Sequence, residues 1–276
     1  MAAVFLILAA SLLYLGTRQQ PKITRLPAKA PDTKITLIEG WSLQDMGNYL
    51  EKNNIVKADD FLKAAKTYNP SAYPLLASKP ASQNLQGFLF PDTYFIPAPT
   101  AENGTAMPNL VISKMLDNFT AKFTPAMQAQ AQSRSMTVYQ IITLASIIEK
   151  ETGRNTVTQE QKDQLEAERK NVASVFYNRL QIGMPLQSDA TVNFVTGKNL
   201  TQASLDDTQI DSPYNTYKYK GLPPGPICNP SLSSIMAALY PAATDYFYFL
   251  TRPDTGQAVF SKTYQEHQQN KQKYLN

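Results

Sequence analysis

The stretch TVYQIITLASIIEKET, residues 137–152, decides the fold and carries the first sign of chemistry. At about 100° per residue, most of its apolar side chains fall on one face of a helix. That face comprises Val138, Ile141, Ile142, Ala145 and Ile148. Glu149 projects into the middle of the apolar face, whereas Glu151 is expected to point away toward solvent. An unpaired carboxylate in such surroundings is costly, so a raised pKa is expected for Glu149.

Glu149 is therefore the candidate general acid of the chain. A protonated Glu near neutral pH is what an enzyme needs to protonate a glycosidic oxygen. The alternative is that Glu149 caps or salt-bridges a structural helix. The projection predicts that Glu149→Gln abolishes catalysis, while Glu151→Gln retains substantial activity.

The composition fits a folded protein of one large or two modest domains. The chain has 276 residues, of which 43% are hydrophobic, including 15 Tyr and 12 Phe. This is enough to fill cores and excludes global disorder. The net charge of +4 is scattered, and no stripe of Lys and Arg interleaves with the aromatic residues. Nucleic acid is thus not an expected partner, whereas an anionic polymer or a membrane surface would be tolerated.

The chain lacks the usual signatures of a metal, nucleotide or Cys/His site. Cys228 is the one cysteine and His267 the one histidine, so neither an internal disulfide nor a His-based metal site is expected. No CxxC, HExxH, GxGxxG or Walker-type loop is present. We therefore expect no metal and no cofactor.

Residues 1–16, MAAVFLILAASLLYLG, predict a transmembrane anchor. The segment has no charged side chain and is a little shorter than the roughly 20 residues of a spanning helix. A signal peptide is the alternative, but the segment lacks a basic n-region. Basic residues follow the segment, so the distribution of charge leaves its orientation open. Residues 17–33 are expected to form a linker.

The segment after the linker predicts a small α/β module. Residues 34–38 alternate as in a short strand, and Ser42 is a plausible N-cap for a helix over residues 43–53. Asp59 or Asp60 is expected to cap a second helix. The aromatic residues of the stretch 85–96 have a period of two around Pro91-Asp92, which indicates strand, turn and strand.

The remainder predicts a mixed α+β domain. Residues 153–164 are polar and are expected to form an exposed loop, and residues 212–227 form a loop made rigid by Pro and Gly. The expected helices and strands are helices 107–122, 165–181 and 231–240, and a hairpin of strands 246–250 and 258–260.

Three long motifs resemble those of one known family. They are LASIIEKET (144–152), NVASVFYNRLQIGMPLQSDATV (171–192) and SPYNTYKYKGLPPGPICNP (212–230). Their order and spacing are similar to those of the endolytic murein transglycosylase family, the YceG-like membrane-anchored lytic transglycosylases. The resemblance covers roughly residues 34–276. It implies a LysM-like module with connecting strands over 34–100 and a YceG-like catalytic domain over 101–276.

The resemblance also implies an activity. The family's catalytic Glu matches the first Glu of the EKE triplet, which is Glu149. The implied reaction is cleavage of the β-1,4 bond between N-acetylmuramic acid and N-acetylglucosamine in peptidoglycan glycan strands, which leaves 1,6-anhydromuramyl ends and limits nascent strand length. The implied location is the outer face of the bacterial cell (inner) membrane, held by a single span, with cell-wall synthases as partners.

Several residues are candidates for positioning the substrate around Glu149. They are Gln187, Asp189, Tyr214, Asn215 and Tyr217, with Asn178 and Arg179 behind them. One alternative is a muramidase-like hydrolase with Asp189 as base, which needs a second carboxylate roughly 5–9 Å from the acid. The other is a non-catalytic peptidoglycan-binding scaffold.

Overall fold

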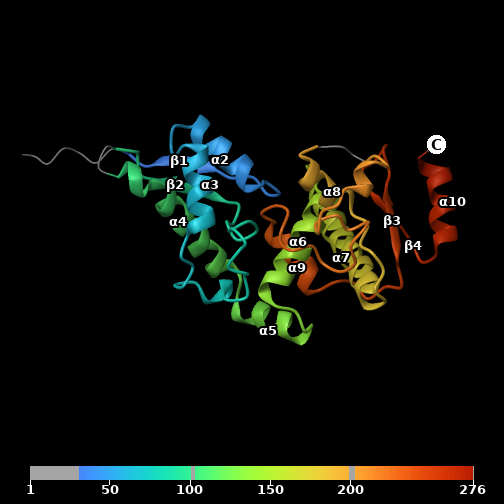
Figure 1. Cartoon of the computed structure of the whole chain (residues 1–276). Coiled ribbons are helices and arrows are strands. Elements are labelled where there is room, and N and C mark those ends of the chain that lie inside the picture. Colours follow the sequence, from blue (N-terminus) through green and yellow to red (C-terminus); the bar gives the residue numbers. More distant parts are fainter. Residues whose placement is uncertain (1–30, 101–102, 199–202, 276) are drawn as a thin grey trace, which may run out of the picture. The chain divides into compact units, whose positions relative to one another are not determined.

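The computed structural model describes residues 31–100, 103–198 and 203–275 (Figure 1). Within these ranges, the residues from Asp32 onward form one unit of helices with two small antiparallel sheets, so the predicted α+β class is confirmed. The anchor predicted at residues 1–16 and the linker residues 17–30 lie outside the described residues. Among the residues that the structure describes, no helix is both long and apolar enough to cross a bilayer.

The N-terminal segment folds as strand, helix, helix and strand. Its elements are β1 (Thr33–Thr36), α2 (Leu43–Lys52), α3 (Ala58–Thr67) and β2 (Thr93–Ile96). The strands are antiparallel, with Thr33 opposite Ile96. Ser42 and Asp45 form a capping box at the start of α2, which confirms the predicted N-cap. The predicted caps of α3 are wrong, because α3 begins at Ala58, before both aspartates.

The strand predicted within the first half of residues 85–96 is wrong. The backbone N–H groups of Gly87 and Leu89 donate to the side-chain oxygen of Asn229, at 2.9 and 3.2 Å. Gly87 has a φ of +92°, and a Cβ there would lie 2.6 Å from Pro226, so the turn requires glycine. The apolar residues of this segment are buried, and its backbone turns around the side chain of Asn229, about 140 residues away, instead of pairing as a strand.

The rest of the unit is mainly helical. The helices are α4 (Met107–Lys122), α5 (Pro125–Ser133), α6 (Val138–Thr152), α7 (Gln159–Gln181), α8 (Asp189–Thr196) and α9 (Leu232–Leu239), with single 3₁₀ turns at Pro74–Leu76, Gly104–Ala106 and Asp207–Gln209. The predicted α4 and α9 are confirmed, with bounds that agree within one residue. The predicted loop 153–164 is only half as long as expected, because Thr158 and Gln161 form a capping box that starts α7.

The helix α6 is enclosed on nearly all sides. Residues 141–149 are all buried, and α6 packs against both α7 and α9. A helix enclosed in this way has no single core face. The projection that separated Glu149 from Glu151 therefore loses its basis.

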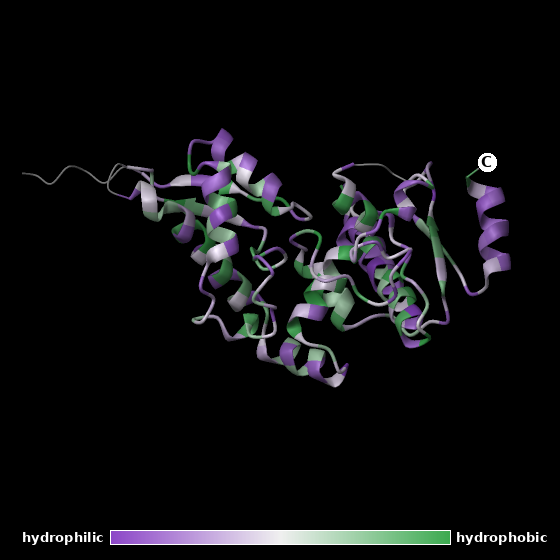
Figure 2. Ribbon diagram, in the orientation of Figure 1, coloured by the Kyte–Doolittle hydropathy of each residue, from purple (hydrophilic) through white to green (hydrophobic). Residues whose placement is uncertain are grey.

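The C-terminal segment is a hairpin followed by a helix. The strands β3 (Tyr248–Thr251) and β4 (Ala258–Ser261) are antiparallel, which confirms the predicted hairpin. The helix α10 (Tyr264–Tyr274), which the sequence patterns did not indicate, is hydrophilic along its length and has no fully buried residue (Figure 2). It covers the hairpin through His267, whose ring stacks on Tyr248 at 5.3 Å.

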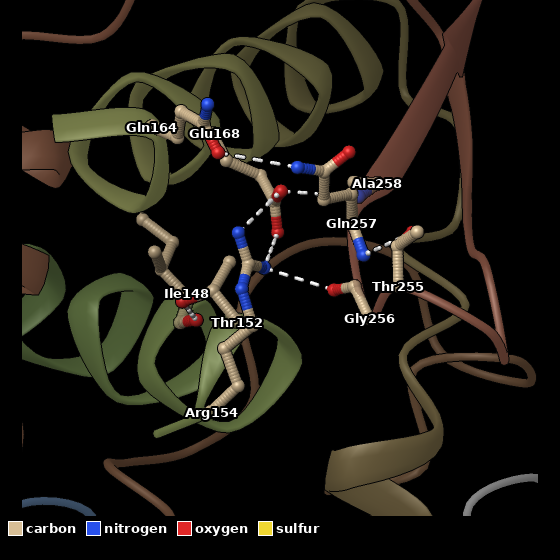
Figure 3. A network of polar contacts seen from close by, with 9 residues as sticks. All are labelled: Ile148, Thr152, Arg154, Gln164, Glu168, Thr255, Gly256, Gln257 and Ala258. Carbon is tan, nitrogen blue, oxygen red and sulfur yellow. Dashed lines mark hydrogen bonds and ion pairs between the residues drawn. The ribbon is translucent and has the colours of Figure 1, made fainter. Parts of the chain in front are cut away.

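A polar network ties this hairpin to the end of α6 (Figure 3). Arg154 donates to Glu168 on α7 at 3.0 Å and to the carbonyl of Gly256 at 2.9 Å. The same carboxylate accepts the N–H of Ala258 at 3.0 Å. A buried carboxylate with both cationic and backbone donors is fully satisfied. The network therefore fixes the chain where it leaves α6, just after Thr152.

Candidate active site

Glu149 lies in a closed polar setting. Its side chain is 5% exposed. Ser231, the N-cap of α9, donates to its carboxylate from the backbone at 2.9 Å and also from the hydroxyl. Arg169 on α7 donates to the other oxygen at 3.4 Å and forms an ion pair with it. The carboxylate thus joins three helices, which is the structural role left open as the alternative.

The turn around Gly40, in the N-terminal segment, covers Glu149. A Cβ added at Gly40 would meet the side chain of Glu149 at 3.5 Å, so the turn packs directly on it. Gly40 and Trp41 exchange backbone hydrogen bonds with Asn229, each at 2.9 Å. Burial, and then the like charge of Glu149, raise the pKa of Glu39 in this turn, whereas Arg169 lowers it. Glu149 is thus closed off by residues distant in the sequence.

Glu151 has a different environment from the one that the projection predicts. Its carboxylate accepts a hydrogen bond from the hydroxyl of Ser188, the N-cap of α8, and one from the backbone of Ala190. Although the residue keeps some accessible surface, desolvation is the largest cause that raises its pKa, to about 7. The bond from Ser188 lowers the pKa, and the charge of Asp189 raises it. The expectation that Glu151 points to solvent is wrong.

Glu151 also lines a pocket of about 820 Å³. This volume is typical of sites that bind small molecules or short polymer segments. Glu149 is not part of the lining. The polar and aromatic groups of the wall are hydroxyls, amides, charged side chains and rings: Ser42, Gln44, Asp45, Gln83, Asn84, Gln86, Tyr139, Lys150, Glu151, Asp189, Asn193, Phe194, Lys198, Tyr214 and Thr251.

Two of the predicted substrate-positioning residues, Asp189 and Tyr214, lie in this wall. Asp189 is the first residue of α8 and accepts a hydrogen bond from the hydroxyl of Tyr217 at 2.8 Å. Tyr217 is not in the lining, so it acts on the pocket through Asp189. Gln187 is exposed, outside the lining, and has a φ of +50°. It is placed beside the site by its backbone bond to Thr216 at 3.0 Å.

The other predicted residues lie outside the pocket lining, and their side chains donate hydrogen bonds to backbone carbonyls. Asn215 is 1% exposed, and its amide donates to the carbonyls of Thr208 and Ile210, both at 2.9 Å. Asn178 likewise donates to two carbonyls of the segment before β3. Arg179 is buried and donates to the carbonyl of Leu186 at 2.6 Å and to that of Phe247 at 2.7 Å.

Arg179 has an electrostatic effect on the site as well. Its charge lowers the pKa of Glu151, although less than the other causes. Because it also fixes Leu186, it positions the segment that delivers Ser188 and Asp189 to Glu151. Arg179 therefore lies beside the pocket wall rather than in it.

Sequence reasoning missed Glu151, Ser188, Ser231, Arg169 and Phe194. The signal that was available is the largely apolar run IITLASII at residues 141–148, which surrounds the helix with apolar side chains on several sides and so gives no reason to prefer one Glu of EKET over the other. Within the residues that the structure describes, no group of His, Cys, Asp and Glu is placed to hold a metal ion.

Comparison with known proteins identifies the family. The sequence profile of the YceG-like family matches residues 15–273. The chain belongs to the YceG-like family. A crystal structure of a putative YceG-like protein from Listeria monocytogenes superposes with a TM-score of 0.73 at 34% identity, over 87% of this chain and 76% of that one.

Curated relatives carry a more specific name. The chain is 36% identical over 252 residues to the endolytic murein transglycosylase of Bacillus subtilis strain 168, and 32% identical over 228 residues to that of Streptococcus pneumoniae serotype 2 strain D39. These matches cover 88% and 80% of this chain. The chain spans 65% of the length of the first relative and 38% of the second.

Proposed function

We propose that this member of the YceG-like family is a peptidoglycan lytic transglycosylase, and that Glu151 rather than Glu149 is its catalytic acid. One observation carries this assignment: Glu151 combines a pKa of about 7 with a place in the wall of a pocket lined by amides, hydroxyls and aromatic rings. The names of the relatives support the reaction class.

A carboxyl group with a pKa near neutrality can both give and take a proton. Protonated Glu151 gives its proton to the glycosidic oxygen as the bond from muramyl C1 to that oxygen breaks. The resulting carboxylate then takes the proton of the muramyl C6 hydroxyl. Oxygen O6 bonds to C1 and closes the 1,6-anhydro ring, so one carboxyl group serves both steps and no water is consumed.

The main alternative is a hydrolase. It is favoured by one observation: Asp189 lines the same pocket and is close enough to raise the pKa of Glu151. In a hydrolase Asp189 would act as base or nucleophile toward water or the sugar. The internal C6 hydroxyl has the advantage of a high effective concentration over water. A non-catalytic scaffold has no use for an acid poised at pH 7 in a pocket.

The remaining expectations on cellular role belong to the same proposal. The cleavage is endolytic and limits the length of nascent strands near the outer face of the membrane, beside cell-wall synthases. The apolar segment 1–16 is the proposed anchor. Deletion of residues 1–20 is expected to leave a folded enzyme that cuts isolated glycan but does not replace the anchored form in cells. Complementation by a secreted, unanchored form would contradict this.

The deciding experiment is mass analysis of the muropeptides released from purified sacculi by the full chain. A transglycosylase leaves 1,6-anhydromuramyl ends, which are one water lighter than the reducing ends of a hydrolase. We expect anhydro ends as the main product from both the wild type and Asp189→Asn, with a lower rate in the variant. Reducing ends that are lost in Asp189→Asn would establish the hydrolase instead.

A further inference from the structure

Phe194 lies in the pocket wall and is much more exposed than a core aromatic residue. It is 39% exposed and lines the same pocket as Glu151. Its ring centre is 5.0 Å from that of Tyr214, and the two rings are inclined by 44°. The two rings are thus adjacent in the pocket wall, beside the polar side chains that line it.

This surface is fixed from two sides. Phe194 belongs to α8, the helix whose N-cap serine bonds to Glu151, so the distance between the ring and the acid is set by one short helix. Tyr214 lies close to Tyr139, because Gly225 between them has no Cβ: an added one would lie 2.3 Å from the Tyr139 hydroxyl and 3.2 Å from that of Tyr214.

Side-chain amides from the segment between α3 and β2 adjoin the rings. Gln83 has a hydrogen-bond contact with Tyr214, and both line the pocket. Gln86 is 6% exposed, and its side-chain oxygen accepts the N–H of Leu43 at 2.7 Å. That bond fixes the orientation of the amide in the pocket wall.

We propose that Phe194 and Tyr214 form a platform on which one pyranose ring of the glycan stacks, with Gln83 and Gln86 binding its acetamido group. The inference rests on the proposed function and names the residues that bind a sugar beside Glu151. The C–H face of a pyranose is apolar and matches a rigid aromatic surface. An acetamido group has one donor and one acceptor, which a side-chain amide complements.

The test is binding to the full chain carrying Glu151→Gln, which prevents turnover. Isothermal titration calorimetry with chitotetraose, a tetramer of N-acetylglucosamine, is compared with cellotetraose, which has the same linkage without acetamido groups. The parent is expected to bind chitotetraose more tightly. Phe194→Ala is expected to weaken that affinity roughly 3- to 10-fold, and Phe194→Trp to retain it.

The matched control is Phe95→Ala. Phe95 is 57% exposed on β2 and is not in the pocket lining, so its removal is expected to leave the affinity unchanged. If Phe194→Ala does not fold, Phe194→Leu removes the ring while keeping apolar volume and is expected to show the same loss.

Each remaining outcome overturns a distinct statement. Unchanged chitotetraose affinity in a folded Phe194 variant without the ring overturns the platform and leaves the proposed function intact. Equal affinity of the parent for the two tetramers overturns the role of the amides. Absence of any binding by the parent overturns the platform, and if the wild type also fails to cleave sacculi, the proposed function is overturned with it.

Discussion

Glu149 and Glu151 lie two residues apart on α6, and each accepts a hydrogen bond from the serine that begins a neighbouring short helix. Beyond that similarity they differ in two respects. Glu149 is ion-paired with Arg169 and is covered by the turn at Gly40. Among the described residues no Lys or Arg forms an ion pair with Glu151, and its carboxylate borders the pocket.

The difference shows what separates a structural acid from a catalytic one. Burial alone does not, because Glu149 is the more buried of the two: its side chain is 5% exposed, whereas Glu151 keeps some accessible surface. A cation that pairs with a buried carboxylate keeps it charged, whereas desolvation without such a pair favours the protonated form. Only the second state provides a proton near neutral pH, and only a site beside a cavity brings that proton to a substrate.

The largest expected effect is on catalysis. Glu151→Gln is expected to lower the rate of glycan cleavage by roughly 10²- to 10⁴-fold, because a general acid contributes about that much. Glu149→Gln, assayed at a temperature where it is folded, is expected to retain most of its activity. The measurement is the initial rate of release of soluble muropeptides from sacculi. Similar losses in the two variants would remove the distinction between the two carboxylates.

The second effect is on stability and has the opposite pattern. Glu149→Gln leaves Arg169 buried without its counter-ion, which is expected to cost about 3 kcal/mol in the free energy of unfolding. Glu151→Gln is expected to cost less than about 1 kcal/mol at pH 7, because its charged form is already disfavoured. Urea denaturation of both variants checks this.

A double variant controls for that interpretation. If the cost comes from an unpaired Arg169, then Glu149→Gln combined with Arg169→Met is expected to be less destabilised than the sum of the two single changes. Strict additivity would mean that the ion pair does not carry the effect.

Much of the fold was predictable because its signals are local. The capping box at Ser42 and the apolar periods of α4 and α9 lie within the elements that they define. The stretch before Pro91 was mispredicted because its backbone N–H groups donate to the side chain of Asn229, about 140 residues away. A period of two cannot distinguish a strand from a buried turn that wraps around a distant side chain.

The candidate site was predictable only in part for a similar reason. The EKET motif indicated the helix that carries the acid, and two of the predicted residues, Asp189 and Tyr214, lie in the pocket wall. The choice between the two Glu residues, however, depends on Arg169, twenty residues away, and on the helices α8 and α9. Phe194 follows Asp189 on α8 without any local signal that its ring stays exposed. Which neighbour covers a side chain is decided by tertiary packing.

The third prediction concerns the pH dependence of stability. The pKa of Glu151 is raised from 4.5 to about 7 in the folded chain, so the folded state binds this proton more tightly than the unfolded state. Its contribution to stability is therefore fully present below about pH 4.5 and is lost as the pH rises to about 7. The loss in the free energy of unfolding is expected to reach at most about 3 kcal/mol. Because the side chain is partly exposed, solvent screening reduces this loss.

The measurement is the difference in the free energy of unfolding between the wild type and Glu151→Gln from pH 4.5 to 8. All other titrating groups are shared, so the difference isolates Glu151. It is expected to fall as the pH rises and to level off above about pH 8. A difference that does not change with pH would mean that Glu151 has an ordinary pKa.

The smallest expected effect separates the two serines. An acid that must be protonated makes kcat/KM fall as the pH rises through its pKa, so the wild type is expected to lose activity above about pH 7. Ser188 donates to Glu151 and lowers that pKa. Ser188→Ala is therefore expected to move the falling limb of the pH profile to higher pH by about one unit.

The control is Ser231→Ala, which removes the matching hydrogen bond to Glu149. It is expected to lower the free energy of unfolding and to leave the falling limb of the pH profile in place. A limb that moves in Ser231→Ala and not in Ser188→Ala would assign the catalytic proton to Glu149, because the hydrogen bond that sets an acid's pKa must be made to that acid.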